Sequence, residues 1–325
     1  MKSRITQIVL TLLSLQLAAG LTFGEETPPP AAPKSPPALT RPGDHSRTLV
    51  VSKEKRAYLV HVPKGYNPET PTPVVLALHG VGMNGPMMVL FSGLNKKSDE
   101  AGFIVVYPSG TGVGPFLKWN ARGLKGDSAE GKADDVEFIG KLLDELAGLV
   151  NVDRRRVYAT GLSNGGMMCY LLAAELSDRI AAIAPVAGRI VTEESEPKRP
   201  VSVIHFHGLK DDIVPFESPQ GKTPSVIKVK GVEESIQTWV RLNGCNETPK
   251  SDTLSKADDE MKVTRKTFGG GKEDSEVVLI VIDEGGHTWP GQDPPVGFIG
   301  KSAKNISAND LLWEFFEKHP MKCNR

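Results

Sequence analysis

Residues 156–166 read RVYATGLSNGG, and this stretch decides the fold class of the chain. The run 156–160 predicts a strand that is buried on both faces, and the apolar segment after it predicts a helix. Gly161 and Gly165 stand two positions before and after Ser163, the G-x-S-x-G spacing of a sharp strand-to-helix turn. Such a turn lifts the serine oxygen above the sheet and leaves no room for side chains at the glycine positions. A serine that merely caps the helix on a glycine-rich turn is the simpler interpretation.

Strand and helix patterns alternate on both sides of this turn. Apolar runs predict further strands at 47–51, 56–62, 73–79, 103–107, 180–186, 201–206 and 277–282, the first two as an antiparallel pair. Helical spacing predicts helices at 139–149, 165–176, 232–242 and 309–318. We therefore predict an α/β protein with a mainly parallel, doubly wound sheet, helices on both faces and no large cap domain. In such sheets, ligands bind beyond the carboxyl ends of the strands.

The N-terminus has the pattern of a secretory signal. Lys2 and Arg4 precede an apolar stretch of roughly 15 residues, and small residues follow it, so we expect a signal peptide at 1–24. The stretch is shorter than the roughly 20 residues that cross a bilayer, so no stable membrane span is expected. Residues 25–45 are rich in proline and predict a linker, which leaves 46–325 as one domain. A secreted or periplasmic location follows.

Composition narrows the possible classes. Lys+Arg and Asp+Glu both number 39, and no basic run stands out, so a nucleic-acid partner is not expected. The three cysteines allow one internal pair; Cys245 with Cys323 is the expected bridge, while Cys169 falls in an apolar helix pattern. His205 and His207 lack a third ligand at a suitable spacing, so we expect them to pack, with no metal and no cofactor. The oligomeric state stays open.

A serine nucleophile needs a neutral imidazole that takes its proton. Among the seven histidines, His287 is the best candidate, because it lies in the segment 284–291 (EGGHTWPG) directly after the predicted strand 277–282. The glycines and the proline of this segment would allow the ring to turn back over the sheet. We therefore predict that Ser163 and His287 meet at the carboxyl ends of the strands.

The imidazole in turn needs a carboxylate that fixes its tautomer. Residues 207–215 (HGLKDDIVP) follow the predicted strand 201–206, and either Asp211 or Asp212 could serve. A capping box at the start of the helix near 139–149 accounts for Asp134 and Asp135. The resulting order of serine, acid and histidine is that of the α/β-hydrolase fold.

A developing oxyanion requires hydrogen-bond donors that are already in place. One should be the backbone N–H of Asn164, directly after the serine. The other should come from the loop after the strand 73–79, where His79, Gly80 and Val81 stand, and we assign it to the N–H of Val81. An ordinary turn is the simpler interpretation of this dipeptide.

Four motifs together resemble the secreted α/β-hydrolase esterases related to polyhydroxybutyrate depolymerases and feruloyl esterases. They are GLSNGG at 161–166, the His79-Gly80 pair, the HGxxD segment at 207–211 and GGHTWPG at 285–291, and the resemblance covers about residues 56–320. It implies that Asp211 is the triad acid. It also implies a serine carboxylic-ester hydrolase that forms an acyl-enzyme on small, oligomeric or polymeric esters. Members of this family often pair the NGC cysteine, here Cys245, with a cysteine at the place of residues 269–271, which are glycines here.

Other functions and the choice of ester stay open at this stage. A catalytically silent binding module on a proline-rich tether and a peptidase on the same fold are the alternatives. Trp119 and Trp289 could line an aromatic acyl pocket or could belong to the core. Five methionines are expected to pack rather than to bind substrate: Met83, Met87, Met88, Met167 and Met168.

Overall fold

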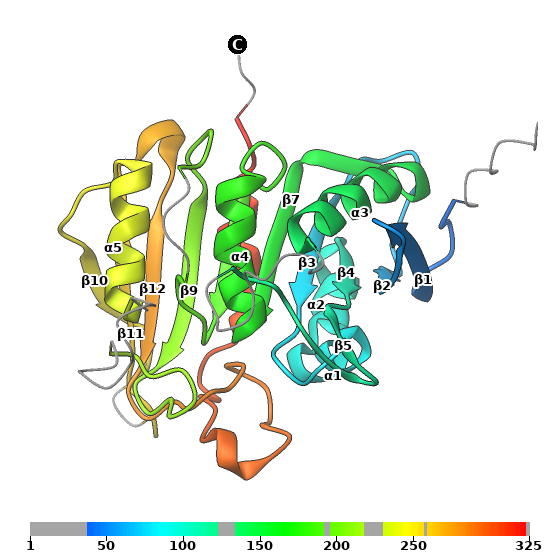
Figure 1. The fold of residues 1–325 in the computed structure, drawn as a ribbon. Helices are drawn as coiled ribbons and strands as arrows, with labels where there is room; N and C mark the ends of the chain where they lie inside the picture. Colours follow the sequence, from blue (N-terminus) through cyan, green and yellow to red (C-terminus); the bar gives the residue numbers. More distant parts are fainter. Residues whose placement is uncertain (1–37, 123–133, 192–195, 218–229, 257–258, 323–325) are drawn as a thin grey trace, which may run out of the picture. The chain divides into compact units, whose positions relative to one another are not determined.

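The computed structural model describes residues 38–122, 134–191, 196–217, 230–256 and 259–322, which contain one large sheet with helices on both faces (Figure 1). Ten strands are hydrogen-bonded in the order β1-β2-β4-β3-β7-β8-β9-β12-β11-β10. Their bounds are β1 Gly43–Val51, β2 Glu54–Val62, β3 Thr72–Leu78, β4 Ile104–Pro108, β7 Val152–Leu162, β8 Ala182–Val186, β9 Ser202–Gly208, β10 Lys250–Thr253, β11 Val263–Phe268 and β12 Val277–Ile282.

The centre of the sheet is parallel, as the sequence predicts. Strands β4, β3, β7, β8, β9 and β12 run parallel to one another. The pairs at the two edges, β1 with β2, β2 with β4, β12 with β11 and β11 with β10, are antiparallel. In β3, Val74, Leu76 and Leu78 pack into one core cluster, and Val75 and Ala77 pack into the other. Burial on both faces explains why this strand is an unbroken apolar run in the sequence.

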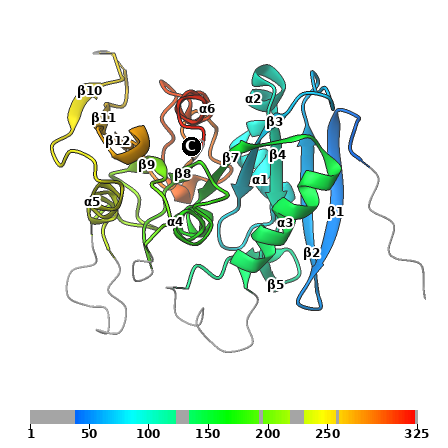
Figure 2. The ribbon, with the colours of Figure 1, turned by 90° about the horizontal axis from the view of Figure 1, so that it is seen from above.

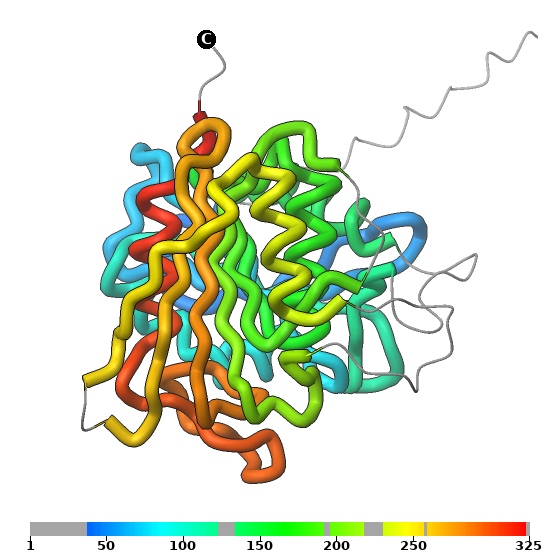
Figure 3. Tube along the Cα trace, turned by 90° about the vertical axis from the view of Figure 1, so that its left-hand side faces the viewer, coloured from blue at the N-terminus to red at the C-terminus, as the bar shows by residue number. Residues whose placement is uncertain are grey.

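Helices cover both faces of the sheet. Apart from Met167, the buried apolar side chains of α3 (Asp135–Leu149), α4 (Asn164–Glu175) and α5 (Val232–Asn243) belong to one core cluster. Those of α1 (Gly85–Ser92), α2 (Leu94–Ala101) and α6 (Ala308–Lys318) belong to the other. Figure 2 shows α3, α4 and α5 on one side of the strands and α2 and α6 on the opposite side. Seen from the β10 edge, α5 (yellow) and α6 (red) again lie on opposite sides (Figure 3).

The start of α3 differs in part from the predicted capping box. Asp134 caps the helix, because its side chain accepts hydrogen bonds from the backbone N–H groups of Val136 at 2.9 Å and Glu137 at 3.0 Å. Asp135 has another role: its carboxylate is buried and pairs with Arg56 at 2.5 Å. The capping pattern therefore accounts for Asp134 alone.

The folded part begins before the predicted domain start at residue 46. Strand β1 begins at Gly43, and the buried Leu39 donates its N–H to the Leu149 carbonyl at 2.8 Å. The predicted signal peptide at 1–24 and most of the predicted linker lie outside the described residues. Within the described ranges, no helix is both long and apolar enough for a membrane span.

The predicted bridge between Cys245 and Cys323 involves a residue outside the described ranges and stays a prediction. Cys169 and Cys245 are free, buried thiols, and the Cys245 thiol donates to the Ser275 carbonyl at 3.6 Å. Cys323 lies outside the described residues. A Cβ added at Gly271 would lie 2.7 Å from Cys245 Sγ. Gly271 therefore occupies the place where the resemblance puts a partner cysteine.

The segment after β3 contains elements that the sequence patterns did not predict. Helices α1 and α2 follow β3, and a short hairpin, β5 (Thr111–Val113) and β6 (Phe116–Lys118), pairs with Met83 through Leu117. Helix α1 has no fully polar face, since Met87 and Leu90 are 41% and 85% exposed. Its amphipathic signal is therefore weak.

Candidate active site

Ser163 lies at the turn between β7 and α4 in a conformation that few non-glycine residues adopt. Its φ and ψ are 55° and −117°. The backbone is held by a hydrogen bond from its N–H to the Val186 carbonyl and by one from Met167 N–H to its own carbonyl, both 2.9 Å. The side chain makes no capping hydrogen bond to the described helix, so a capping role does not account for this serine.

The glycines on either side of Ser163 are required by close backbone packing. A Cβ at Gly161 would lie 2.6 Å from the carbonyl carbon of Gly165, and a Cβ at Gly165 would lie 2.2 Å from the Leu78 carbonyl oxygen. Both contacts are far shorter than real side chains tolerate, and both involve backbone atoms that cannot rotate away. The G-x-S-x-G spacing thus follows from the packing of the turn against the end of β3.

Gly165→Ala should destabilise this turn, whereas the matched change Gly140→Ala should not. We expect the first to lower the free energy of unfolding by about 3 kcal/mol, because the added methyl meets backbone. Gly140 lies inside α3 with nothing within 4 Å of an added Cβ, so alanine there should raise that free energy by about 0.5–1 kcal/mol. Urea unfolding measures both. A Gly165→Ala protein that unfolds at the wild-type urea concentration contradicts the packing argument.

The loops after β9 and β12 bring Asp211 and His287 together. His287 Nδ1 donates to Asp211 Oδ2 at 2.8 Å. Asp211 Oδ1 accepts hydrogen bonds from the N–H groups of Ile213 at 3.0 Å and Val214 at 2.8 Å, and the carboxylate is buried. Asp212 is exposed, so the geometry selects Asp211 from the two candidates. Because Nδ1 carries a proton, the neutral ring of His287 has its lone pair on Nε2.

Ser163 and His287 line the same cavity, whose volume is about 450 Å³. It lies at the carboxyl ends of the parallel strands, as expected for a doubly wound sheet. Apart from the backbone of Gly80, the other lining residues all have apolar side chains: Val81, Met83, Met87, Leu90, Phe91, Leu162, Ile213, Pro295, Val296, Phe298 and Ile299. Leu90 and Phe298 are 85% and 81% exposed, so the rim of the cavity is apolar as well.

The cavity lining corrects two groups of predictions. Trp119 and Trp289 are fully buried and are not among the lining residues, and Trp289 Nε1 donates to Asn309 Oδ1 at 2.9 Å. Both tryptophans therefore belong to the core. Met83 and Met87, in contrast, line the cavity, although they were expected to pack. The other three methionines of that group are buried.

Of the two predicted oxyanion donors, Val81 is among the residues that line this cavity, while Asn164 is not and follows the lining residue Ser163 directly in the chain. Val81 lines it and is 59% exposed, and within the described residues its N–H has no hydrogen-bond partner. Asn164 is the first residue of α4, so its N–H cannot bond within the helix. The positive end of the helix dipole adds to the attraction for an anion at this point.

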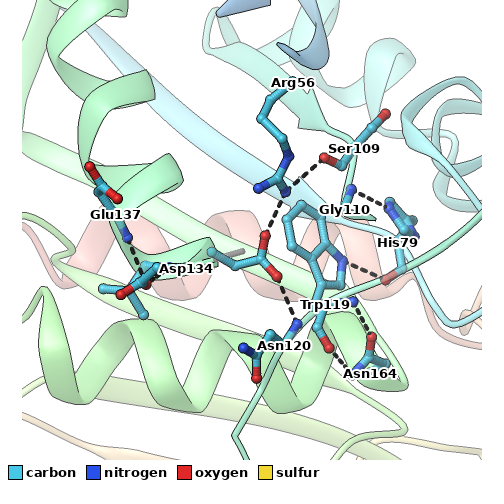
Figure 4. Close-up of polar contacts among 11 residues, drawn as sticks. Arg56, His79, Ser109, Gly110, Trp119, Asn120, Asp134, Glu137 and Asn164 are labelled. Atoms are coloured by element: carbon cyan, nitrogen blue, oxygen red, sulfur yellow. Dashed lines mark hydrogen bonds and ion pairs between the residues drawn. The ribbon is translucent and has the colours of Figure 1, made fainter. Parts of the chain in front are cut away.

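Buried hydrogen bonds fix the backbone around these donors (Figure 4). Asn164 Oδ1 accepts from the Trp119 N–H at 2.6 Å, and Asn164 Nδ2 donates to the Trp119 carbonyl at 3.2 Å. Trp119 Nε1 donates to the His79 carbonyl at 2.9 Å. His79 Nδ1 donates to the Gly80 carbonyl at 2.8 Å, and its Nε2 accepts from the Gly110 N–H at 2.9 Å. Burial lowers the pKa of His79 to about 4, so this ring stays neutral and holds the loop.

A buried ion pair between Arg56 and Asp135 holds both ends of the segment 109–120, which contains Gly110 and Trp119. Arg56 Nη2 contacts Asp135 Oδ1 at 2.5 Å and the Ser109 carbonyl at 3.2 Å, and its guanidinium lies 4.0 Å from the centre of the Phe138 ring. Asp135 Oδ2 accepts from the Asn120 N–H at 2.7 Å. Burial raises the pKa of Asp135, against the lowering effect of Arg56. Removing one partner of such a pair typically costs about 3–5 kcal/mol, because the other charge is left buried and unpaired.

His205 and His207 lie in β9 beneath the Asp211 loop, and both are buried. Within the described ranges, no group of three or more His, Cys, Asp or Glu side chains could hold a metal ion.

Comparisons with known proteins match this chain to one family model and to proteins named as esterases. The model of the prolyl oligopeptidase family matches residues 91–197, about a third of the chain, which includes Ser163 but neither Asp211 nor His287. The protein NocK of Nocardia uniformis subsp. tsuyamanensis, which carries the name of an esterase, is 32% identical over 334 residues, covering 93% of this chain and 96% of NocK. Feruloyl esterase C of Emericella nidulans is 27% identical, covering 80% and 83%.

Solved structures show the same architecture. The acetyl xylan esterase from Aspergillus awamori has a TM-score of 0.56 at 16% identity, covering 84% of this chain and 99% of that one. The sheet, the glycine turn and the cavity thus define an α/β hydrolase. The chain belongs to the α/β-hydrolase esterase family, as its similarity to NocK over nearly the whole length of both proteins shows, and it is a carboxylic ester hydrolase.

Proposed function

We propose that this chain hydrolyses carboxylic esters with Ser163 as nucleophile, His287 as general base and acid, and Asp211 as the carboxylate that orients the imidazole. The observation that carries the proposal is the 2.8 Å hydrogen bond from His287 Nδ1 to Asp211 Oδ2 beside a cavity that Ser163 also lines. This bond fixes the tautomer in which Nε2 can accept a proton, and the carboxylate stabilises the imidazolium that forms.

The reaction then proceeds in two steps. Ser163 Oγ attacks the ester carbonyl carbon while His287 Nε2 takes the hydroxyl proton. The tetrahedral intermediate collapses, the bond to the alcohol oxygen breaks, and His287 returns the proton to the leaving alcohol. Water attacks the acyl-enzyme by the same route, which releases the acid and restores Ser163. The N–H groups of Val81 and Asn164 stabilise the oxyanion, and each such donor typically contributes about 2.7–4 kcal/mol.

Ser163→Ala should abolish turnover with the fold retained, a loss of about 10⁶-fold in kcat. Asp211→Asn should lower kcat about 10⁴-fold, because an amide favours the wrong imidazole tautomer. Asp212→Asn is the matched control and should be close to wild type, since Asp212 is exposed. Hydrolysis of a p-nitrophenyl ester measures all three, and circular dichroism checks folding. An active Asp211→Asn protein, or an inactive Asp212→Asn protein, would reject the assignment.

The cavity favours esters with an apolar acyl group. Among the residues that the structure describes, its lining offers no charged side chain and, besides Ser163 and His287, no side-chain hydrogen-bond partner. Burying a methylene in such a cavity contributes about 0.8 kcal/mol, whereas burying a hydroxyl without a partner is unfavourable. Feruloyl esters can place an aromatic ring there and hydroxyalkanoate esters their hydrocarbon part, each with its hydroxyl group left toward solvent, while an acetyl group fills little of the volume. We therefore favour the first two classes over acetylated carbohydrates.

Peptide-bond hydrolysis is the second candidate, and one finding favours it. The prolyl oligopeptidase family model matches residues 91–197. Acyl transfer at an amide uses the same nucleophile and base, so the residues of the site do not separate the two reactions. The similarity to NocK extends over nearly the whole chain and therefore carries more weight.

A substrate series should separate these possibilities. For p-nitrophenyl esters, kcat/KM should rise about fourfold with each added CH₂ from acetate to butyrate, which is the factor that 0.8 kcal/mol gives. Methyl ferulate and hydroxybutyrate oligomers should be better substrates than acetylated xylan. The p-nitroanilide of butyric acid should be cleaved far more slowly than the ester. Rates that fall from acetate to butyrate would contradict the apolar-acyl proposal, and faster cleavage of the anilide would favour the peptidase.

We further propose that the chain is exported, with residues 1–24 removed, residues 25–45 as a tether and the domain following. The basic n-region and the apolar stretch support this proposal. After expression in a bacterium, mass spectrometry of the periplasmic or secreted protein should give an N-terminus near residues 21–25. A protein that keeps Met1 and stays in the cytoplasm would exclude export.

A further inference from the structure

A row of three buried side chains connects α4 to the loop that carries Asp211. Tyr170 Oη lies 2.9 Å from His205 Nδ1, His205 Nε2 lies 3.1 Å from His207 Nδ1, and His207 Nε2 lies 2.8 Å from the Val214 carbonyl oxygen. The three side chains are 4%, 0% and 1% exposed. The row begins on the helix that follows Ser163 and ends at the turn of the catalytic acid.

The contacts allow one arrangement of protons. A carbonyl oxygen only accepts, so His207 Nε2 carries a proton and donates to Val214. Burial lowers the pKa of His207 to about 4 and holds that of His205 well below its usual range, so both rings are neutral. His207 Nδ1 therefore accepts from His205 Nε2–H, and His205 Nδ1 accepts from the Tyr170 hydroxyl. Every side-chain nitrogen and oxygen of the row has a hydrogen-bond partner. Each O–H or N–H of the row donates to the next group in the direction of the loop that carries Asp211.

His207 closes the turn that holds Asp211. The Val214 N–H donates to Asp211 Oδ1 at 2.8 Å, and the carbonyl of the same residue accepts from His207 Nε2. His207 Nε2 also lies 3.5 Å from Asp211 Oδ2, the oxygen that accepts from His287. The neutral Nε2–H of His207 therefore faces both the Val214 carbonyl and Asp211 Oδ2, the oxygen that accepts from His287.

We propose that His207 is a positioning residue for the esterase reaction: as a neutral Nε2–H tautomer set by Tyr170 and His205, it holds the Asp211 carboxylate in the orientation that His287 requires. The proposal rests on the triad assigned above. Without the N–H of His207, the turn from Asp211 to Val214 loses a buried hydrogen bond, and Oδ2 is free to move away from His287. A displaced carboxylate stabilises the imidazolium less well.

Several titratable or charged groups face His207. His205 lies on the same strand and connects His207 to Tyr170 on α4, while Asp211 on the loop after β9, His287 on the loop after β12 and Arg189 after β8 act on His207 directly. Burial is the main cause of the low pKa of His207; His287 and Arg189 lower it further, while Asp211 and the hydrogen bond to the Val214 carbonyl raise it. With a pKa of about 4, the ring is a neutral donor near neutral pH.

His207→Phe removes the donor while keeping a ring of similar size. We expect kcat per active site to fall about 10–100-fold, as is common when an outer partner of a functional site is lost, with KM within about threefold of wild type. The acid limb of the kcat/KM profile should move to lower pH by about half a unit or more, since a less stabilised imidazolium forms only at lower pH. Active sites are counted by titration with a fluorophosphonate, so that misfolded protein does not contribute.

Two further variants separate positioning from packing. His207→Gln keeps an amide N–H that can reach Val214, so most of the kcat and the wild-type pH profile should return. Tyr170→Phe deletes only the hydroxyl that starts the row and should shift the profile in the same direction by a smaller amount. Its matched control is Tyr158→Phe, because the buried Tyr158 hydroxyl has no hydrogen-bond partner in the described structure. That control should leave kcat and the pH profile unchanged.

The outcomes are distinct. If His207→Phe has the wild-type kcat per site and acid limb while Asp211→Asn is inactive, the positioning role is wrong and the triad stands. If Asp211→Asn is itself active, the proposed function fails and this inference fails with it. Should His207→Phe not fold, Tyr170→Phe decides alone: an acid limb identical to that of Tyr158→Phe overturns the proposal.

Discussion

The close approach of α4 to the end of β3 is the constraint on which the site depends. The Leu78 carbonyl lies where any side chain at position 165 would be, so any residue other than glycine would push the turn away from β3. The contact places Ser163 and the first N–H of α4 next to the chain that leaves β3, which turns directly into Gly80 and Val81. One packing contact therefore brings the proposed nucleophile, with Asn164 directly after it, close to the loop of Val81, and Ser163 and Val81 line the same cavity.

Much of the fold could be predicted because its signals are local. The strands of a parallel sheet are buried on both faces, so they appear as unbroken apolar runs such as the one in β3. The strand, turn and helix around Ser163 lie within a short segment whose glycine spacing is dictated by sterics. Ser163, Asp211 and His287 each follow a different predicted strand. A parallel sheet brings the carboxyl ends of its strands to one edge, so the three residues could be expected to meet there.

The remaining features depend on contacts between distant residues, for which a single sequence has no signal. Arg56 and Asp135 are 79 positions apart, and nothing in their local patterns indicates a buried ion pair. Trp119 was one of two aromatic candidates for the pocket, yet its indole N–H holds the loop after β3. Helix α1 was missed because Met87 and Leu90 face the cavity rather than bearing polar groups. Here the apolar side chains that line the cavity remove the polar face that would mark an amphipathic helix.

The central claim is that one hydroxyl, that of Ser163, is activated by His287 and Asp211. Labelling the intact protein with a fluorophosphonate, digesting it and mapping the adduct by mass spectrometry tests this claim most directly. We predict one adduct per chain, on the peptide that contains Ser163, and rapid formation of this adduct in the native protein. Protein that is unfolded in urea before the reagent is added should not form it. No adduct, or an adduct on another residue with Ser163 unmodified, would contradict it.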